Sequence, residues 1–116
     1  MTQIMIHQME QIIKFSIANE YSKYPGPRKE FQGKNSAEKF YSDFLKPLYL
    51  RAISNNQDIV VDLDGTVGYS SAFLDGSFGE LAREYGYEIV RKRLEFISED
   101  EPFLIDEIDY YMKPKK

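Results

Sequence analysis

The run DIVVDL, Asp58–Leu63, constrains the fold of this chain more than any other stretch of its 116 residues. Its β-branched apolar residues lie between Asn55-Asn56-Gln57, which breaks helices, and the turn sequence Asp64-Gly65-Thr66. A run this short and this apolar is typical of a strand that is covered on both faces. We therefore expect residues 58–63 to form the central strand of a sheet.

A strand, a loop and a helix are expected before this run. Residues 11–18 (QIIKFSIA) alternate apolar and polar side chains, which predicts a half-buried strand. Residues 35–54 carry one apolar helical face, with Asn35 as the expected N-cap and Glu38 reaching back to it in a capping box. Pro47 lies inside that pattern, so we expect it to kink or divide the helix.

Residues 70–85 (SSAFLDGSFGELAREY) repeat apolar side chains at helical spacing, despite Gly76 and Gly79. Two glycines three residues apart lower helix stability unless a neighbour must approach closely there. The neighbour is either the sheet beneath or a partner above, and packing on the sheet is the simpler explanation. Gly86 is expected to end this helix as a left-handed cap.

The remaining elements follow the same reasoning. The second half of residues 87–98 alternates Leu94 and Phe96 with charged residues, as a strand does. Residues 101–112 predict a closing helix with Pro102 in its first turn and Leu104, Ile108 and Tyr111 on its inner face. The order β, loop, α, β, α, β, α predicts one small α/β domain, with a mixed sheet and three to four helices. Residues 1–10 are expected to be disordered or to add one short element.

Composition excludes several classes of function. The net charge of −4 argues against general affinity for nucleic acid. With no cysteine and a single histidine, the chain is not expected to hold a metal, a cofactor or a cysteine nucleophile. No run approaches the roughly 18 apolar residues of a membrane span, and the start has no secretory signal pattern. A cytoplasmic protein is expected.

Residues 19–35 gather Pro25, Gly26, Pro27 and Gly33, so they cannot form regular structure. The segment is long for a bare connection, which leaves two interpretations open: a functional loop, or a hairpin with an irregular end. Arg28 within it is able to meet a partner's carboxylate or a phosphate bidentately, although a single loop arginine is usually only solvated.

The pentapeptide Asp62-Leu63-Asp64-Gly65-Thr66 has the DxDGT pattern of haloacid-dehalogenase phosphatases. In such an enzyme, Asp62 would be the nucleophile and Asp64 the general acid and base. That family places this loop after its first strand and needs a later Ser or Thr, a Lys and a carboxylate pair. Here a strand and a helix already precede the loop, and the same residues also suit an ordinary turn.

A longer stretch carries a second resemblance. GYSSAFLDGSFGELAREYG, from Gly68 to Gly86 and preceded by VDLDG, closely resembles the STAS-like proteins of the DUF4325 family. The upstream Gly26-Pro27-Arg28, Gly33 and Ser36-Ala37-Glu38-Lys39-Phe40 are similar to the loop and first helix of that family. The resemblance covers about residues 13–111. Its matching positions after the central strand are Ser70, Ser71, Phe73, Leu74, Phe78, Gly79 and Leu81.

The resemblance implies a small α/β regulatory domain. In the related anti-sigma-factor antagonists, a kinase phosphorylates a serine where the helix after the central strand begins, and Ser70 and Ser71 fall at that junction. A phosphate there would be stabilised by the helix dipole. One of the two serines is equally suited to be the helix N-cap. The chain departs from the antagonists at Tyr69 and at Ala72-Phe73, which puts phosphorylation in question.

Three functions follow from these observations. The first is a non-enzymatic regulatory domain that binds a protein, expected to be a histidine-kinase-like ATPase, through Arg28, Tyr69, Phe73, Asp75 and Gly76. The second is the magnesium-dependent phosphatase. The third is an acidic protein that blocks a basic partner surface through its C-terminal carboxylates, which are Glu99, Asp100, Glu101, Asp106, Glu107 and Asp109. The sequence gives no indication of the oligomeric state.

Overall fold

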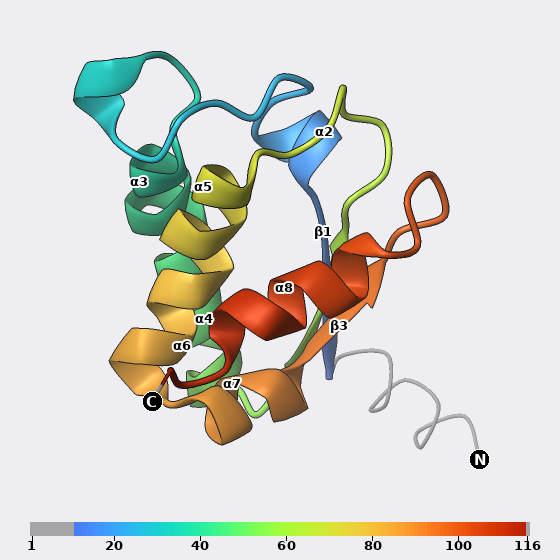
Figure 1. Cartoon of the computed structure of the whole chain (residues 1–116). Coiled ribbons are helices and arrows are strands. Elements are labelled where there is room, and N and C mark those ends of the chain that lie inside the picture. Colours follow the sequence, from blue (N-terminus) through green and yellow to red (C-terminus); the bar gives the residue numbers. More distant parts are fainter. Residues whose placement is uncertain (1–10, 116) are drawn as a thin grey trace.

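The computed structural model describes residues 11–115, which form the expected single α/β domain (Figure 1). Strands β1 (Ile12–Ser16), β2 (Asp58–Asp62) and β3 (Leu94–Ile97) lie in the order β1-β2-β3, so the DIVVDL run does supply the central strand. Both neighbours run parallel to β2, whereas a mixed sheet was expected. The reason is that helices connect each strand to the next and return the chain to the same end of the sheet.

Two helical connections and one closing helix pack on the sheet. Between β1 and β2 the chain forms α2 (Ile17–Glu20), the 3-10 turn η1 (Glu30–Gln32), α3 (Ala37–Phe40), the π-helical turn η2 (Tyr41–Leu45) and α4 (Lys46–Ser54). Between β2 and β3 it forms α5 (Ser71–Leu74), the π-helical turn η3 (Asp75–Gly79), α6 (Glu80–Tyr85) and α7 (Tyr87–Arg93). Helix α8 (Leu104–Met112) follows β3.

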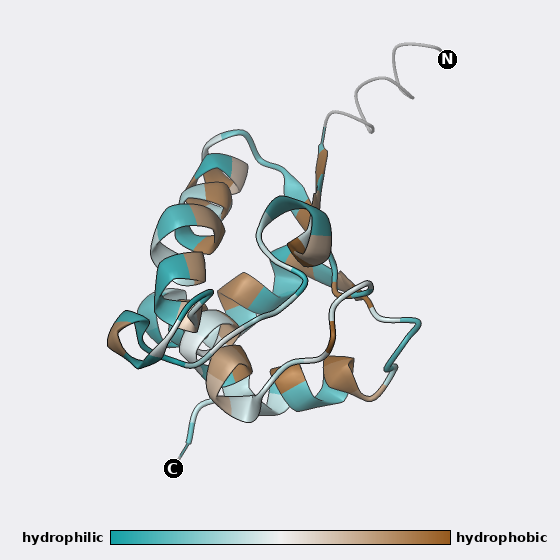
Figure 2. Ribbon diagram, turned by 90° about the horizontal axis from the view of Figure 1, so that it is seen from above, coloured by the Kyte–Doolittle hydropathy of each residue, from teal (hydrophilic) through white to brown (hydrophobic). Residues whose placement is uncertain are grey.

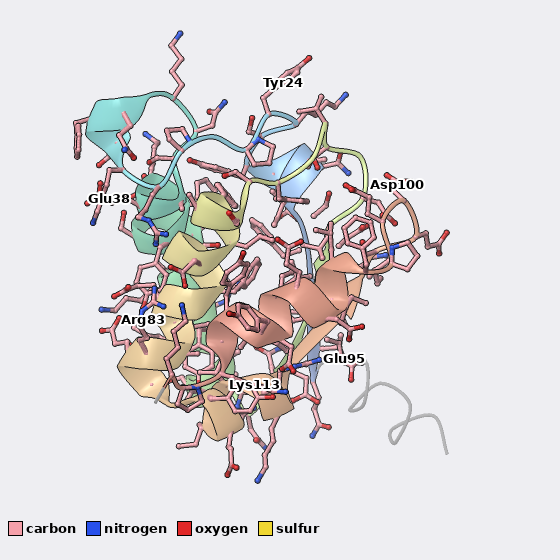
Figure 3. All side chains as sticks on the ribbon, viewed as in Figure 1. Tyr24, Glu38, Arg83, Glu95, Asp100 and Lys113 are labelled. Atoms are coloured by element: carbon pink, nitrogen blue, oxygen red, sulfur yellow. The ribbon has the colours of Figure 1, made fainter. Side chains whose placement is uncertain are left out.

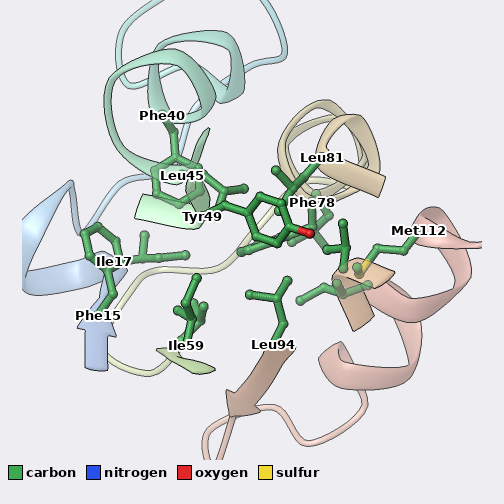
Figure 4. Packing of buried hydrophobic residues seen from close by; sticks show 14 of the residues in the cluster. Phe15, Ile17, Phe40, Leu45, Tyr49, Ile59, Phe78, Leu81, Leu94 and Met112 are labelled. Carbon is green, nitrogen blue, oxygen red and sulfur yellow. The ribbon is translucent and has the colours of Figure 1, made fainter. Parts of the chain in front are cut away.

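The helices cover one face of the sheet. Phe15, Ile59 and Leu94 point from the three strands toward the helices (Figure 4) and are buried. The helices in turn direct their apolar sides inward (Figure 2). Val60 points to the opposite face and is only partly buried. Within residues 11–115, the expectation that β2 is covered on both faces is therefore wrong, because the described helices lie on one side of this small sheet.

Aromatic rings hold the centre of the core together. Phe40 of α3 is completely buried, and the centroid of its ring lies 5.2 to 6.5 Å from five others. These rings come from β1, from both helical connections and from the chain after α2. The packing of the domain therefore converges on this one side chain. The five partners are Phe15, Tyr21, Phe44, Phe73 and Phe78.

The helix predicted over residues 35–54 is present, but it begins differently. Ser36 is the N-cap, and its Oγ accepts the amide of Lys39 at 3.0 Å. Asn35 has a φ of 57°, which is the left-handed conformation that asparagine tolerates and that ends the preceding loop. The carboxylate of Glu38 accepts the amide of Glu30, in that loop, and not the amide of Asn35. The expected capping box is therefore wrong.

Pro47 does not divide the helix. The chain continues through η2 directly into α4, and Pro47 lies in the first turn of α4. A proline has no N–H, and its ring would clash with the carbonyl four residues earlier in a regular α-helix. The wider π-helical turn immediately before Pro47 changes that spacing, so the helix accommodates the proline without a break.

Several shorter elements were not predicted. Ile17 begins α2 and does not continue β1, and residues 87–93 form α7 before the expected strand β3. Pro102 precedes α8, whose buried face ends on Met112, with Tyr111 only partly buried. The expectation for residues 1–10 lies outside the described residues. Within residues 11–115, no helix is both long enough and apolar enough to cross a bilayer.

Tyr49 of α4 offers a direct test of this core. It is completely buried among apolar side chains (Figure 4), and its hydroxyl has no hydrogen-bond partner among the described residues. Burial also raises the pKa of this hydroxyl. Because Tyr49→Phe removes a desolvated polar group and keeps the ring, we expect it to raise the free energy of unfolding by about 1 kcal/mol.

Urea denaturation followed by circular dichroism checks this expectation. Tyr69→Phe is the matched control, since the Tyr69 hydroxyl donates to the carbonyl of Leu63 at 2.8 Å. That control should lose about 1 kcal/mol. Equal losses for both variants would show that the Tyr49 hydroxyl has a partner.

Candidate functional site

Two neighbouring loops meet above the carboxyl ends of the parallel strands, the usual place for a site in an α/β fold. The amide of Val67 donates to the carbonyl of Lys23 at 2.9 Å, which ties the loop after α2 to the loop after β2. Val67 and Tyr24 are 74% and 64% exposed on these loops (Tyr24 is labelled in Figure 3). Ser70 and Ser71 follow at the start of α5 and are also exposed. We call these four residues the Ser70 edge.

The two serines have different surroundings. Ser70 is the N-cap of α5, and its Oγ accepts the amide of Phe73 at 3.1 Å. Ser71 is the first residue of the helix, and its hydroxyl has no hydrogen-bond partner within the described chain. The capping role therefore falls to Ser70, which leaves the Ser71 hydroxyl free for other chemistry.

This difference predicts opposite results for two alanine variants. Ser70→Ala should lower the free energy of unfolding by about 1 kcal/mol, because an amide of the first helical turn loses its acceptor. Ser71→Ala should change it by less than about 0.5 kcal/mol, since no hydrogen bond is lost. Thermal and urea denaturation of the two variants measure the difference. A larger loss in Ser71→Ala than in Ser70→Ala would show that Ser71, and not Ser70, is the N-cap.

Tyr69 and Phe73 support this edge from below. The Tyr69 hydroxyl donates to Leu63, and burial raises its pKa to about 12. The ring centroids of Tyr69 and Phe73 are 5.9 Å apart, and Phe73 is completely buried in the core. Phe73 was expected on the binding surface, but the first turn of α5 directs it inward against Phe40. Tyr69 is only partly buried and joins the core to the exposed edge.

Arg28 and Asp75, both expected to meet a partner, meet each other. Arg28 Nη1 lies 2.8 Å from Asp75 Oδ2, and Arg83 Nη1 lies 2.9 Å from Asp75 Oδ1 (Arg83 is labelled in Figure 3). Partial burial alone would raise the pKa of Asp75, but the hydrogen bonds from Arg83 and Arg28 hold it below its ordinary value. The pair fastens the loop before α3 to the helix after Ser70.

The two helical glycines permit close packing between helices. A Cβ added at Gly76 would lie 3.1 Å from the Cβ of Ala37 and 3.0 Å from the Cγ of Arg28. One added at Gly79 would lie 3.3 Å from the carbonyl oxygen of Tyr111. The close neighbours are thus α3 with its preceding loop and α8. The preferred explanation, packing on the sheet, is wrong, and Gly76 lies beneath Arg28.

The carboxylates of the DLDGT segment bind backbone amides. Asp62 Oδ1 accepts the amide of Asp64 at 3.0 Å. The two oxygens of Asp64 accept the amides of Glu99 and Asp100, at 3.0 and 2.9 Å. Asp100 in turn accepts the amide of Gly65 at 3.1 Å. The bonds of Asp64 and Asp100 join the loop after β2 to the loop after β3, whereas the bond of Asp62 shapes the turn itself, so Asp62 and Asp64 both have a structural role.

The C-terminal carboxylates are not all solvated. Asp109 accepts hydrogen bonds from the Tyr87 hydroxyl at 2.7 Å and from Arg91 Nε at 3.2 Å, and Lys113 lies 3.3 Å away. Partial burial opposes ionisation, but Tyr87, Lys113 and Arg91 together keep the pKa of Asp109 below its ordinary value. Asp109 therefore connects α7 with α8. Among the described residues, no group of three or more acidic or histidine side chains has the geometry of a metal site.

Tyr24 and Val67 were missed by the sequence analysis. Both are large apolar residues inside segments rich in glycine, proline and polar residues, a signal that was available. What the sequence did not show is that the two segments lie side by side, because this depends on the backbone bond between Val67 and Lys23.

Comparison with known proteins gives one result. No curated protein and no solved structure matches the chain. The family model of the STAS-like domain of unknown function (DUF4325) matches residues 36–103, which includes β2, β3, the Ser70 junction and the glycine pair. The match leaves out the loop that contains Arg28 and all of α8, although the resemblance in the sequence was traced over about residues 13–111. Since it spans more than half of the chain, this protein belongs to the STAS-like DUF4325 family.

Proposed function

We propose that this domain is a non-enzymatic regulatory module that binds a partner protein through the Ser70 edge. The observation that carries the proposal is the exposed, unpaired hydroxyl of Ser71 at the end of the loop that carries the exposed Val67, which is bonded to the loop of the exposed Tyr24. Apolar side chains that stay exposed on loops tied to each other are typical of interaction sites.

The partner in this proposal is a histidine-kinase-like ATPase in the cytoplasm, which transfers a phosphoryl group from ATP to the Ser71 hydroxyl. The hydroxyl oxygen forms a bond to the γ-phosphorus, its proton leaves to a base, and ADP is released. A phosphate at the first residue of α5 lies near the positive end of the helix dipole, where its charge is stabilised. The same charge on the Ser70 edge, which also carries Tyr24 and Val67, would oppose an apolar contact there, so phosphorylation acts as the release signal.

Phosphorylation is tested by intact-mass measurement of the purified protein after incubation with ATP and a lysate of its native cells. We expect a gain of one phosphate in the wild type and in Ser70→Ala, and none in Ser71→Ala. A gain of one phosphate in Ser71→Ala would show that another residue is phosphorylated. No gain in the wild type would overturn the switch and leave constitutive binding at the edge.

The phosphatase alternative has no comparable support, because the Asp64 carboxylate is held by two backbone amides. Hydrolysis of a generic phosphate ester with magnesium, lost in Asp62→Asn, would nevertheless replace our proposal with that enzyme. The acidic-inhibitor alternative is weakened in a similar way by the bonds of Asp109 to Tyr87 and Arg91.

A further inference from the structure

The segment before α3, whose role the sequence left open, is firmly fixed. We define residues 26–36 as the Phe31 loop. The amide of Gly26 donates to the carbonyl of Asn35 at 2.8 Å, which closes the loop at its base. The amides of Ala37 and Glu38 donate to the carbonyls of Pro27 and Arg28, at 2.8 and 2.9 Å. The loop is therefore attached both to itself and to the first turn of α3.

The tip of the loop is fixed as well. The amide of Lys29 donates to the Gln32 side chain and the amide of Glu30 to the Glu38 carboxylate, both at 3.0 Å. Within η1, the amide of Gln32 donates to the carbonyl of Lys29 at 3.0 Å. A loop held in this way loses little conformational entropy when it binds, which favours tight recognition.

This rigid tip presents an aromatic ring to solvent. Phe31 lies in η1 and is 88% exposed, the highest value for a large apolar side chain in the described part of the chain. Single exposed apolar residues are common on protein surfaces. Here, however, η1 projects beyond α3 at a corner of the molecule (Figures 1 and 2), so a partner is able to surround the whole ring. Aromatic anchors of this kind provide much of the energy of protein interfaces.

Two lysines flank Phe31 in the sequence. Lys29 precedes Phe31 and Lys34 follows it, and both side chains are free of ion pairs with other described residues. A shallow hollow beside η1 is lined by Lys34, Lys39 and Glu30. Of the two carboxylates nearby, that of Glu38 is already bound to the Glu30 amide. The tip thus offers two lysines without ion pairs among the described residues, next to the carboxylates of Glu30 and Glu38, on a chain whose net charge is −4.

We propose that Phe31 inserts into an apolar pocket on the partner protein, and that carboxylates around this pocket meet Lys29 and Lys34. This inference rests on the proposed function, because it gives the same partner a second point of contact. A protein fits the loop better than a nucleic acid does, since nucleic-acid affinity depends on several phosphate contacts and the chain as a whole is acidic. The complementary charges would steer the two proteins together and set their orientation.

Photocrosslinking in the native cells tests the two contacts separately. p-Benzoylphenylalanine is placed at position 31 in the loop, at position 67 in the Ser70 edge and, as a control, at position 110. Tyr110 is 64% exposed on α8, outside both proposed contacts. We expect the same protein to be captured from positions 31 and 67 and not from position 110.

Affinity measurements with the captured protein, purified, then test the chemistry. Phe31→Ala should weaken binding by about 30-fold or more. The double variant Lys29→Glu, Lys34→Glu should weaken it by about 10-fold, with a larger effect at low salt. Tyr110→Ala should leave the affinity unchanged. All the substituted side chains are exposed, so the variants should fold normally.

The outcomes separate the two proposals. Capture from position 67 alone would overturn the Phe31 contact and keep the Ser70 edge, and capture from position 31 alone would do the reverse. No capture from either would overturn both. Recovery of nucleic acid at position 31, or an affinity that survives Phe31→Ala or the lysine reversal, would also overturn this inference.

Discussion

Phe40→Ala should lower the free energy of unfolding by about 3 to 5 kcal/mol. The side chain is completely buried, and its ring contacts five other rings from separate elements of the fold. Truncation leaves a cavity at the point where the helical connections meet β1, and these elements cannot all collapse into it. Because domains of this size are stable by only about 5 to 15 kcal/mol, we expect the variant to be partly unfolded at physiological temperature.

Phe31→Ala is the matched control, since it makes the same chemical change at an exposed position. It should change the free energy of unfolding by less than about 0.5 kcal/mol. Urea denaturation of both variants, followed by circular dichroism, gives the comparison. A loss below about 1 kcal/mol in Phe40→Ala would mean that the core is not centred on this ring. A large loss in Phe31→Ala would show that the loop tip packs against the domain.

The strands and the longer helices of this fold were predictable because each carries its own pattern of apolar residues. The alternation in residues 11–18, the apolar run at 58–63 and the helical spacing over residues 70–85 all lead to elements that the structure confirms. The strand directions were not predictable from those patterns alone, since they depend on how the helices return the chain. It was also not predictable that the described helices cover only one face of β2. The apolar Val60 looks the same in the sequence whether or not a layer covers it.

The site shows the same division between local and distant information. The position of Ser70 and Ser71 at a strand-to-helix junction followed from the sequence, and the structure assigns the cap to Ser70. Arg28 and Asp75 were expected at the binding surface, but they lie 47 positions apart in the chain and form an ion pair. Local sequence does not indicate such a partner. A charged residue therefore resembles a binding residue until its partner within the fold is known.

Asp64→Asn should lower the free energy of unfolding by about 2 kcal/mol. Both oxygens of Asp64 accept backbone amides from the loop after β3, and an asparagine has only one acceptor oxygen. Its NH₂ group would face one of these amides, donor against donor, which leaves that amide without a partner. Asp62→Asn is the matched control because its single remaining oxygen still accepts the amide of Asp64, so its loss should stay below about 0.5 kcal/mol.

Measuring both hydrolysis and stability for Asp62→Asn and Asp64→Asn decides whether the DLDGT segment is structural or catalytic. If the two carboxylates are only structural, Asp64→Asn is the less stable variant and neither variant differs from the wild type toward p-nitrophenyl phosphate with magnesium. A phosphatase would instead lose turnover in both variants, because Asp62 would be its nucleophile and Asp64 its general acid and base. Activity lost in Asp62→Asn, with stability retained, would make the segment catalytic. A stability loss confined to Asp64→Asn, with hydrolysis unchanged in both variants, would make the segment only a clamp between the loops after β2 and β3.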